Sequence, residues 1–169
     1  TVEKEPLIPI GHEIACDQFR LPIESPKKAF KTSGPKLTVS TNGDNLSASS
    51  SKVNFMFNKK TGIVTSYKVD GTEYFSEGFG IQPNFWRAPT DNDYGNGMPK
   101  RLQVWKESSK NFNVTDATVT MDGNNAVVNV NYLLPAGNLY IVNYTIYPSG
   151  AVNVAARFTS TDMDAAQTE

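Results

Sequence analysis

The sequence has only one cysteine, Cys16, and one histidine, His12, among its 169 residues. A single cysteine excludes a disulfide within the chain, and one cysteine beside one histidine argues against a structural zinc site. No apolar run is long enough to cross a bilayer as a helix, and the N-terminus lacks the charged and then apolar pattern of a signal peptide. The redox compartment stays undecided, so both the cytoplasm and the periplasm remain open.

The chain also lacks an excess of charge of either sign. Lys and Arg together number 16 and Asp and Glu number 17, which gives a net charge of −1. Without a basic surface there is no electrostatic reason to expect nucleic acid or an anionic membrane as a partner. The length suits one large β domain, or a small module followed by a medium one.

A change of composition near the N-terminus predicts two modules joined by a linker. Residues 11–21 alternate loosely between apolar and polar side chains, which predicts one strand. A lone strand cannot bury its own face, so we interpret residues 1–24 as the closing strand of a preceding β-sandwich domain. Residues 25–35 are rich in Pro, Lys, Ser and Gly and are predicted to be a linker to a second module over residues 36–169.

Short alternating segments separated by turn residues predict that this second module is an antiparallel β-sandwich. The period-two pattern is clearest over residues 128–132, 140–146 and 152–158, where apolar side chains alternate with polar ones. The dipeptide Asn42-Gly43 predicts a hairpin of the type I′ class, and Asp70-Gly71 predicts a second turn. The fold class is therefore all-β.

One short helix is predicted over residues 98–110. Pro99 suits its first turn, and Leu102 and Trp105 share one face. Trp105 could stack on a sugar or could fix the helix onto a sheet, and we favour the second interpretation. Residues 159–169 are small and polar and are predicted to form a frayed tail.

The segment 84–97, which reads NFWRAPTDNDYGNG, concentrates chemically active side chains. Its proline, asparagines and glycines disfavour a strand or a helix interior, so it is predicted to be an ordered loop. The guanidinium of Arg87 is suited to clamping a carboxylate, so a pair with Asp91 or with Asp93 is expected to hold the loop in shape. Burial of Trp86 and such a pair could also do nothing more than fix the loop.

The order of residues from Asn84 to Gly95, with Trp105-Lys106 downstream, resembles the signature that opens the C-terminal small-chain domain of family 2 β-galactosidases. Residues 7–19 resemble the end of the immunoglobulin-like domain that precedes it. The resemblance covers most of the chain. It implies that residues 36–169 are the N-terminal part of a sandwich that resembles the galactose mutarotase supersandwich.

This resemblance implies a non-catalytic C-terminal fragment of an enzyme that hydrolyses terminal β-D-galactosides with retention. In that family both catalytic glutamates lie in a (β/α)₈ barrel, which also holds Mg and Na ions, so neither a catalytic residue nor a cofactor is expected in this chain. The fragment is expected to pack on the barrel, and a homo-oligomer remains open. The side chains expected to shape the sugar pocket are Arg87, Asp91, Asn92 and Asp93, with Trp86 and Pro89 fixing the loop.

Other chemistry in the loop is not expected. Retaining hydrolysis needs two carboxyl groups about 5 to 5.5 Å apart, whereas Asp91 and Asp93 would point to opposite faces of an extended chain. A calcium loop beginning at Asp91 would need Gly and Glu where Asn96 and Leu102 stand. The alternative function is a free-standing carbohydrate-binding sandwich, whose sugar-stacking aromatics would be Trp86, Tyr94 or Trp105.

Overall fold

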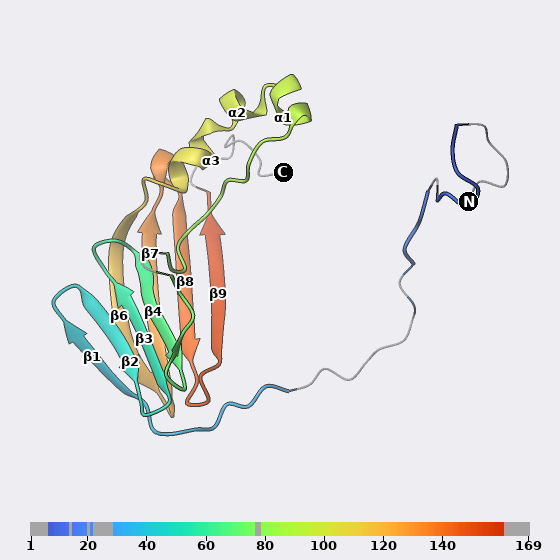
Figure 1. Ribbon diagram of the computed structural model, residues 1–169. Helices are drawn as coiled ribbons and strands as arrows, with labels where there is room; N and C mark the ends of the chain where they lie inside the picture. The colour runs from blue at the N-terminus through green and yellow to red at the C-terminus, as the bar shows by residue number, and fades with distance from the viewer. Residues whose placement is uncertain (1–6, 14, 20, 22–28, 77–78, 161–169) are drawn as a thin grey trace.

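The computed structural model describes residues 7–13, 15–19, 21, 29–76 and 79–160. Within them, two antiparallel sheets stack face to face (Figure 1). One sheet has the strand order β1-β2-β3-β4-β5 and the other β6-β7-β8-β9, so every neighbouring pair is also consecutive in the chain. The predicted all-β antiparallel sandwich is confirmed.

The elements have the following bounds. The first sheet consists of β1 (Thr38–Asn42), β2 (Asn45–Ser49), β3 (Val53–Asn58), β4 (Ile63–Val69) and β5 (Thr72–Glu73). The second sheet consists of β6 (Asn113–Asp122), β7 (Asn125–Leu133), β8 (Leu139–Ile146) and β9 (Val152–Thr159). The helices are α1 (Asp91–Gly95), α2 (Met98–Arg101), α3 (Gln103–Ser108) and the 3₁₀ turn η1 (Pro135–Gly137).

The core lies between the two sheets and follows the period-two pattern. Strand β3 alternates buried and half-buried positions, and β7 does the same over most of its length. Phe55 of β3 and Tyr144 of β8 meet across the core with ring centroids 5.6 Å apart. Tyr132 donates its hydroxyl to the Gly62 carbonyl at 2.9 Å and so joins the sheets by a buried hydrogen bond. Each such side chain contributes about 1.5–3 kcal/mol through burial.

Both predicted turns form hairpins, but the type I′ geometry belongs to the second. The first hairpin has Gly43 and Asp44 at its centre, because Asn42 pairs with Asn45. Type I′ requires positive φ at both central residues, and among the described non-glycine residues only Asp70 has one, at 50°. Gly71 follows with φ of 82°. The prediction of a type I′ turn at Asn42-Gly43 was therefore wrong in class, although the hairpin is there.

The helical part differs from the single helix that the sequence predicts, because the described residues contain three short α-helices. The expected helix over residues 98–110 is interrupted at Leu102, whose φ of −106° and ψ of 20° separate α2 from α3. The third helix, α1, lies in the segment that was predicted to be a loop. All three gather at one end of the sandwich (Figure 1).

The predicted strand over residues 11–21 is not formed by the described residues of that segment, which are exposed. A strand needs a neighbour to pair its backbone hydrogen bonds, and none of the strands in the described part of the chain pairs with this segment. Its assignment to a preceding sandwich domain stays a prediction. The predicted tail falls mostly outside the described residues, since residues 161–169 are not among them.

Strand β9 lies at the edge of the second sheet, and the first sheet does not cover it. Val154 pairs with Tyr144 and therefore points to the core side, yet it is 48% exposed, whereas Tyr144 is 1% exposed. Phe158 on the same side is 40% exposed. Among the described residues no strand pairs with the outer edge of β9. Such an apolar, unpaired edge favours association with another strand.

We therefore expect the 169-residue chain to self-associate through β9, and Val154→Lys to suppress this, because a lysine on the apolar face of an edge strand opposes edge-to-edge pairing. Sedimentation velocity over a concentration series measures the effect. Gln103→Lys, which adds the same charge on the exposed surface of α3, is the control and should associate as the unmodified chain does. A monomeric unmodified chain, or equal association of the Val154→Lys chain, would contradict the expectation.

Candidate functional site

The segment 84–97 lies at the helical end of the sandwich, beyond the strand ends rather than within the core (Figure 1). Its first residues run toward α1, and Gly97, with φ of 72°, turns the chain from α1 into α2. Asp91, Asn92 and Tyr94 of α1 are exposed. The segment thus has an outward surface that another protein part can meet.

An ion pair between Arg87 and Asp93 organises this segment. The guanidinium donates two hydrogen bonds to the carboxylate, from Nη1 to Oδ2 at 2.5 Å and from Nη2 to Oδ1 at 2.9 Å. The Arg87 side chain remains 60% exposed and that of Asp93 is 8% exposed. Of the two partners that the sequence left open, Asp93 is therefore the one that pairs with Arg87.

Asp93 also closes the first turn of α1. Its Oδ2 accepts the backbone N–H of Thr90 at 2.6 Å and the Thr90 hydroxyl at 2.9 Å. An acidic side chain at the third helical position that accepts the N–H of the capping residue is the return half of a capping box. The Asp93 carboxylate thus accepts four hydrogen bonds from within the segment. Its role is therefore to hold the shape of the loop.

The guanidinium of Arg87, followed by the backbone N–H of Thr90, holds the pKa of the Asp93 carboxyl well below its usual range. Since an unfolded aspartate titrates near pH 3.9, the carboxylate stabilises the folded loop fully above about pH 4. This stabilisation is lost as the pH falls through the depressed folded-state pKa.

We therefore expect the loop to open at acid pH before the sheets unfold. Amide hydrogen exchange of residues 90–96, corrected for intrinsic rates, should accelerate between about pH 4 and about pH 2. In the Asp93→Asn chain the same amides should exchange faster at neutral pH and change little on acidification. Equal protection of these amides at about pH 6 and about pH 2 in the unmodified chain would contradict the assignment.

A hydrogen bond and an aromatic cluster attach the loop to the rest of the fold. The backbone N–H of Phe85 donates to Ser109 Oγ at 2.6 Å, next to the end of α3. The Phe85 ring lies 5.1 Å from that of Tyr140 and 6.1 Å from that of Trp105. Trp105 in turn lies 5.5 Å from Phe158 of β9. Trp105 is 4% exposed and thus fixes α3 onto the sheet, as predicted.

The two residues that were predicted to shape the loop, Trp86 and Pro89, are both half-buried. Trp86 packs against the small cluster that Met98, Leu102 and Trp105 form between α2 and α3. The predicted site residues fall into two groups. Arg87 and Asp93 bind each other, whereas Asp91 and Asn92 are exposed, and their side chains have no hydrogen-bond partner among the described residues.

Sequence reasoning missed Thr90 and Ser109, which hold the loop by hydrogen bonds. The signal for Thr90 was present, because a Thr followed three residues later by an acid approximates the capping-box pattern. No comparable signal exists for Ser109, since its contact with Phe85 spans 24 residues.

The described residues hold neither a cluster of metal-ligating side chains nor a membrane-spanning helix. No group of three or more His, Cys, Asp and Glu side chains there is arranged to hold a metal ion. No helix in the described part of the chain is long and apolar enough to span a membrane. What the arrangement offers is an exposed set of hydrogen-bonding groups on a short helix held by a charged pair.

Comparison with known proteins gives a consistent result. The family described as beta galactosidase small chain matches residues 49–167. A beta-galactosidase of Priestia megaterium is 34% identical over 146 residues, which is 85% of this chain and 14% of that protein. A beta-galactosidase of Kluyveromyces lactis is 30% identical over 147 residues, 81% of this chain and 14% of that protein.

A third relative is a separate, shorter protein. The beta-galactosidase small subunit of Latilactobacillus sakei is 26% identical over 129 residues, which is 62% of this chain and 39% of that subunit. The chain therefore spans about 14% of the length of the first two relatives, and a larger but still minor share of the small subunit.

Proposed function

The chain belongs to the β-galactosidase small-chain family, and on this premise we propose that it is a non-catalytic part of an enzyme that hydrolyses terminal β-D-galactosides with retention. The chain packs on the catalytic barrel of that enzyme, and its 84–97 loop helps to shape the galactose pocket. The two catalytic glutamates, and the Mg and Na ions that the family uses, belong to the barrel.

The proposal is supported most directly by the fact that some side chains of the loop hold its shape whereas others are exposed. Arg87 and Thr90 together donate four hydrogen bonds to the Asp93 carboxylate, and so fix the backbone of α1. Asp91 and Asn92 are then presented outward on a rigid turn. An amide offers both donors and an acceptor, and a carboxylate accepts, which suits contact with sugar hydroxyls or with a neighbouring domain. Because the backbone of α1 is already held, binding at these side chains does not have to order the backbone as well.

Substitutions in the parent enzyme test the proposal. Asn92→Ala and Asp91→Ala should each raise the KM for lactose about 10-fold, which corresponds to one lost hydrogen bond, and should leave the fold unchanged by circular dichroism. Lys100→Ala, an exposed change on α2, is the matched control and should leave KM unchanged. If neither loop substitution alters KM or the association of this chain with the barrel, the proposal fails.

The second candidate function is a free-standing carbohydrate-binding module, and the exposure of one aromatic side chain supports it. Of the three aromatics that could stack on a sugar, Trp105 is 4% exposed and Trp86 is half-buried, but Tyr94 is 65% exposed. Calorimetry of the chain with lactose separates the two functions. The second candidate requires binding that Tyr94→Ala removes, whereas our proposal requires that Tyr94→Ala leave lactose binding by the isolated chain unchanged.

A further inference from the structure

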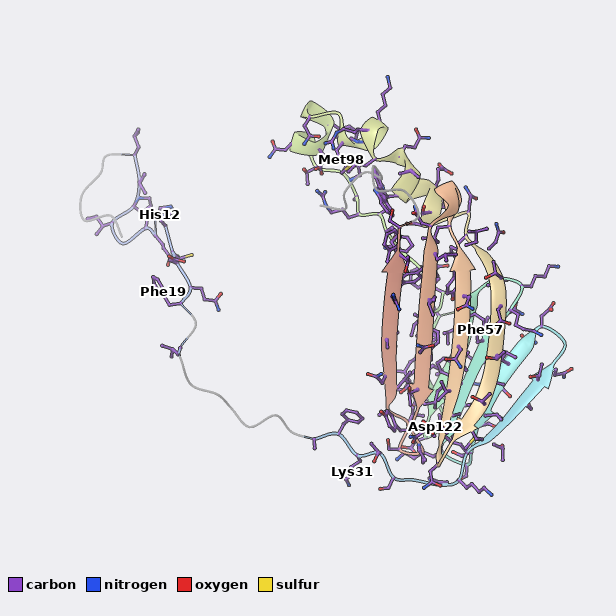
Figure 2. All side chains as sticks on the ribbon, turned by 180° about the vertical axis from the view of Figure 1, so that it is seen from behind. His12, Phe19, Lys31, Phe57, Met98 and Asp122 are labelled. Atoms are coloured by element: carbon purple, nitrogen blue, oxygen red, sulfur yellow. The ribbon has the colours of Figure 1, made fainter. Side chains whose placement is uncertain are left out.

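A cavity of about 600 Å³ lies at the end of the sandwich opposite the 84–97 loop. One wall comes from the segment of residues 29–36, which leads into β1, and is formed by Thr32, Ser33, Gly34 and Lys36. The other wall consists of the turn after β6, with the strand residues beside it, and the turn after β8. Figure 2 shows Lys31 and Asp122 at this end and Met98 at the far end. The site is therefore separate from the loop on which the proposed function depends.

Residues 29–35 were predicted to be part of a linker, yet they contact the sandwich. The rings of Phe30 and Tyr147 meet edge to face with centroids 5.5 Å apart. Gly34 lies so close to Pro148 that an added Cβ would be 2.1 Å from the Pro148 carbonyl oxygen. Leu37, directly after the segment, is 1% exposed in the core. The contacts of Phe30, Gly34 and Leu37 place this segment against the sandwich, where it forms one wall of the cavity.

The cavity is lined by polar side chains of mixed kind around one aromatic ring. It carries one cation and one carboxylate, so the lining charge sums to zero. The polar side chains of the lining used in the argument are Thr32, Ser33, Lys36, Asp122, Asn124 and Tyr147. Within the described part of the chain, these six side chains have no hydrogen-bond or ion-pair partner.

We propose that this cavity binds a neutral, polyhydroxylated molecule of monosaccharide size. Its volume falls within the roughly 300–1,000 Å³ of small-molecule sites. Because the charges of Lys36 and Asp122 cancel, the lining favours neither an anion nor a cation. Interspersed donors and acceptors suit hydroxyl groups, each of which both donates and accepts. The ring of Tyr147 adds an amphipathic wall of the kind that covers the apolar face of a sugar.

Titration of the ¹⁵N-labelled 169-residue chain with galactose, glucose and glycerol tests the inference. At least one of the two sugars should give saturable shifts in the backbone amides of residues 32–34, 36 and 122–125. Asp122→Ala and Asn124→Ala should each weaken this binding about 10-fold or more. Asp122 ends β6 and Asn124 lies in the turn that follows, and both are exposed, so the fold should persist, and an unchanged amide spectrum of the core strands verifies this.

The matched control is Asp91→Ala at the other end of the molecule, which should leave these shifts unchanged. Three results would overturn the inference: shifts that do not saturate, as for a cavity that holds water only; shifts confined to α1; or binding that persists in the Asp122→Ala and Asn124→Ala chains. None of these results bears on the association of the 84–97 loop with the barrel, so the two proposals succeed or fail separately.

Discussion

Replacing Phe55 with alanine is expected to lower the free energy of unfolding by about 3–5 kcal/mol. Phe55 is completely buried, and its ring lies 5.6 Å from that of Tyr144 in the opposite sheet and 6.4 Å from that of Tyr67 in the neighbouring strand. Its removal would leave a cavity where the two sheets meet, and packed strands on both sides cannot close such a cavity fully.

The loss would be a large part of the stability of a domain of this size, since folded domains are stable by only about 5–15 kcal/mol. Urea unfolding followed by tryptophan fluorescence measures it. Phe79→Ala removes the same side chain from a position that is 72% exposed, and it should change the free energy of unfolding by less than about 0.5 kcal/mol. Similar losses in the two variants would show that the sheets do not pack as described.

The Asp93→Asn substitution is expected to release the 84–97 loop while the two sheets stay folded. An asparagine presents one amide N–H₂ group where Arg87 needs a second acceptor, so the two-bond contact is lost and two donors face each other. Amide exchange of residues 90–96 should accelerate, whereas that of β7 and β8 should not. On the proposed function, kcat/KM of the parent enzyme should fall about 10- to 100-fold, because a displaced loop would no longer orient the sugar.

Asp91→Asn, on the same helix but outside the ion pair, is the control and should leave the exchange of residues 90–96 unchanged. Arg87→Lys offers a second test from the other partner. A lysine keeps the charge but cannot present two parallel donors, so it should reproduce part of the loss. Unaltered exchange and activity in the Asp93→Asn protein would show that the pair does not hold the loop.

The sequence by itself determined the all-β class and most of the strands. Alternation of apolar and polar residues depends only on the period of a strand, so β7 and β8 could be predicted from local pattern alone. The same holds for the hairpins, because Gly next to Asn or Asp marks a turn wherever it occurs between strands. The spacing of Leu102 and Trp105 likewise predicted that these two side chains, one at the start of α3 and one within it, are buried.

Tertiary structure decided what covers each face and which charged groups meet. Val154 and Tyr144 lie on the apolar faces of strands with the same alternating pattern, yet Val154 is exposed and Tyr144 is buried. Alternation shows which side of a strand is apolar, but it does not show whether a second sheet covers that side. The choice of Asp93 over Asp91 as the partner of Arg87 depended on the fold of α1, since two carboxylates at similar spacing differ only in where the helix points them. Local periodicity is a property of one segment, whereas burial and pairing are properties of two segments brought together.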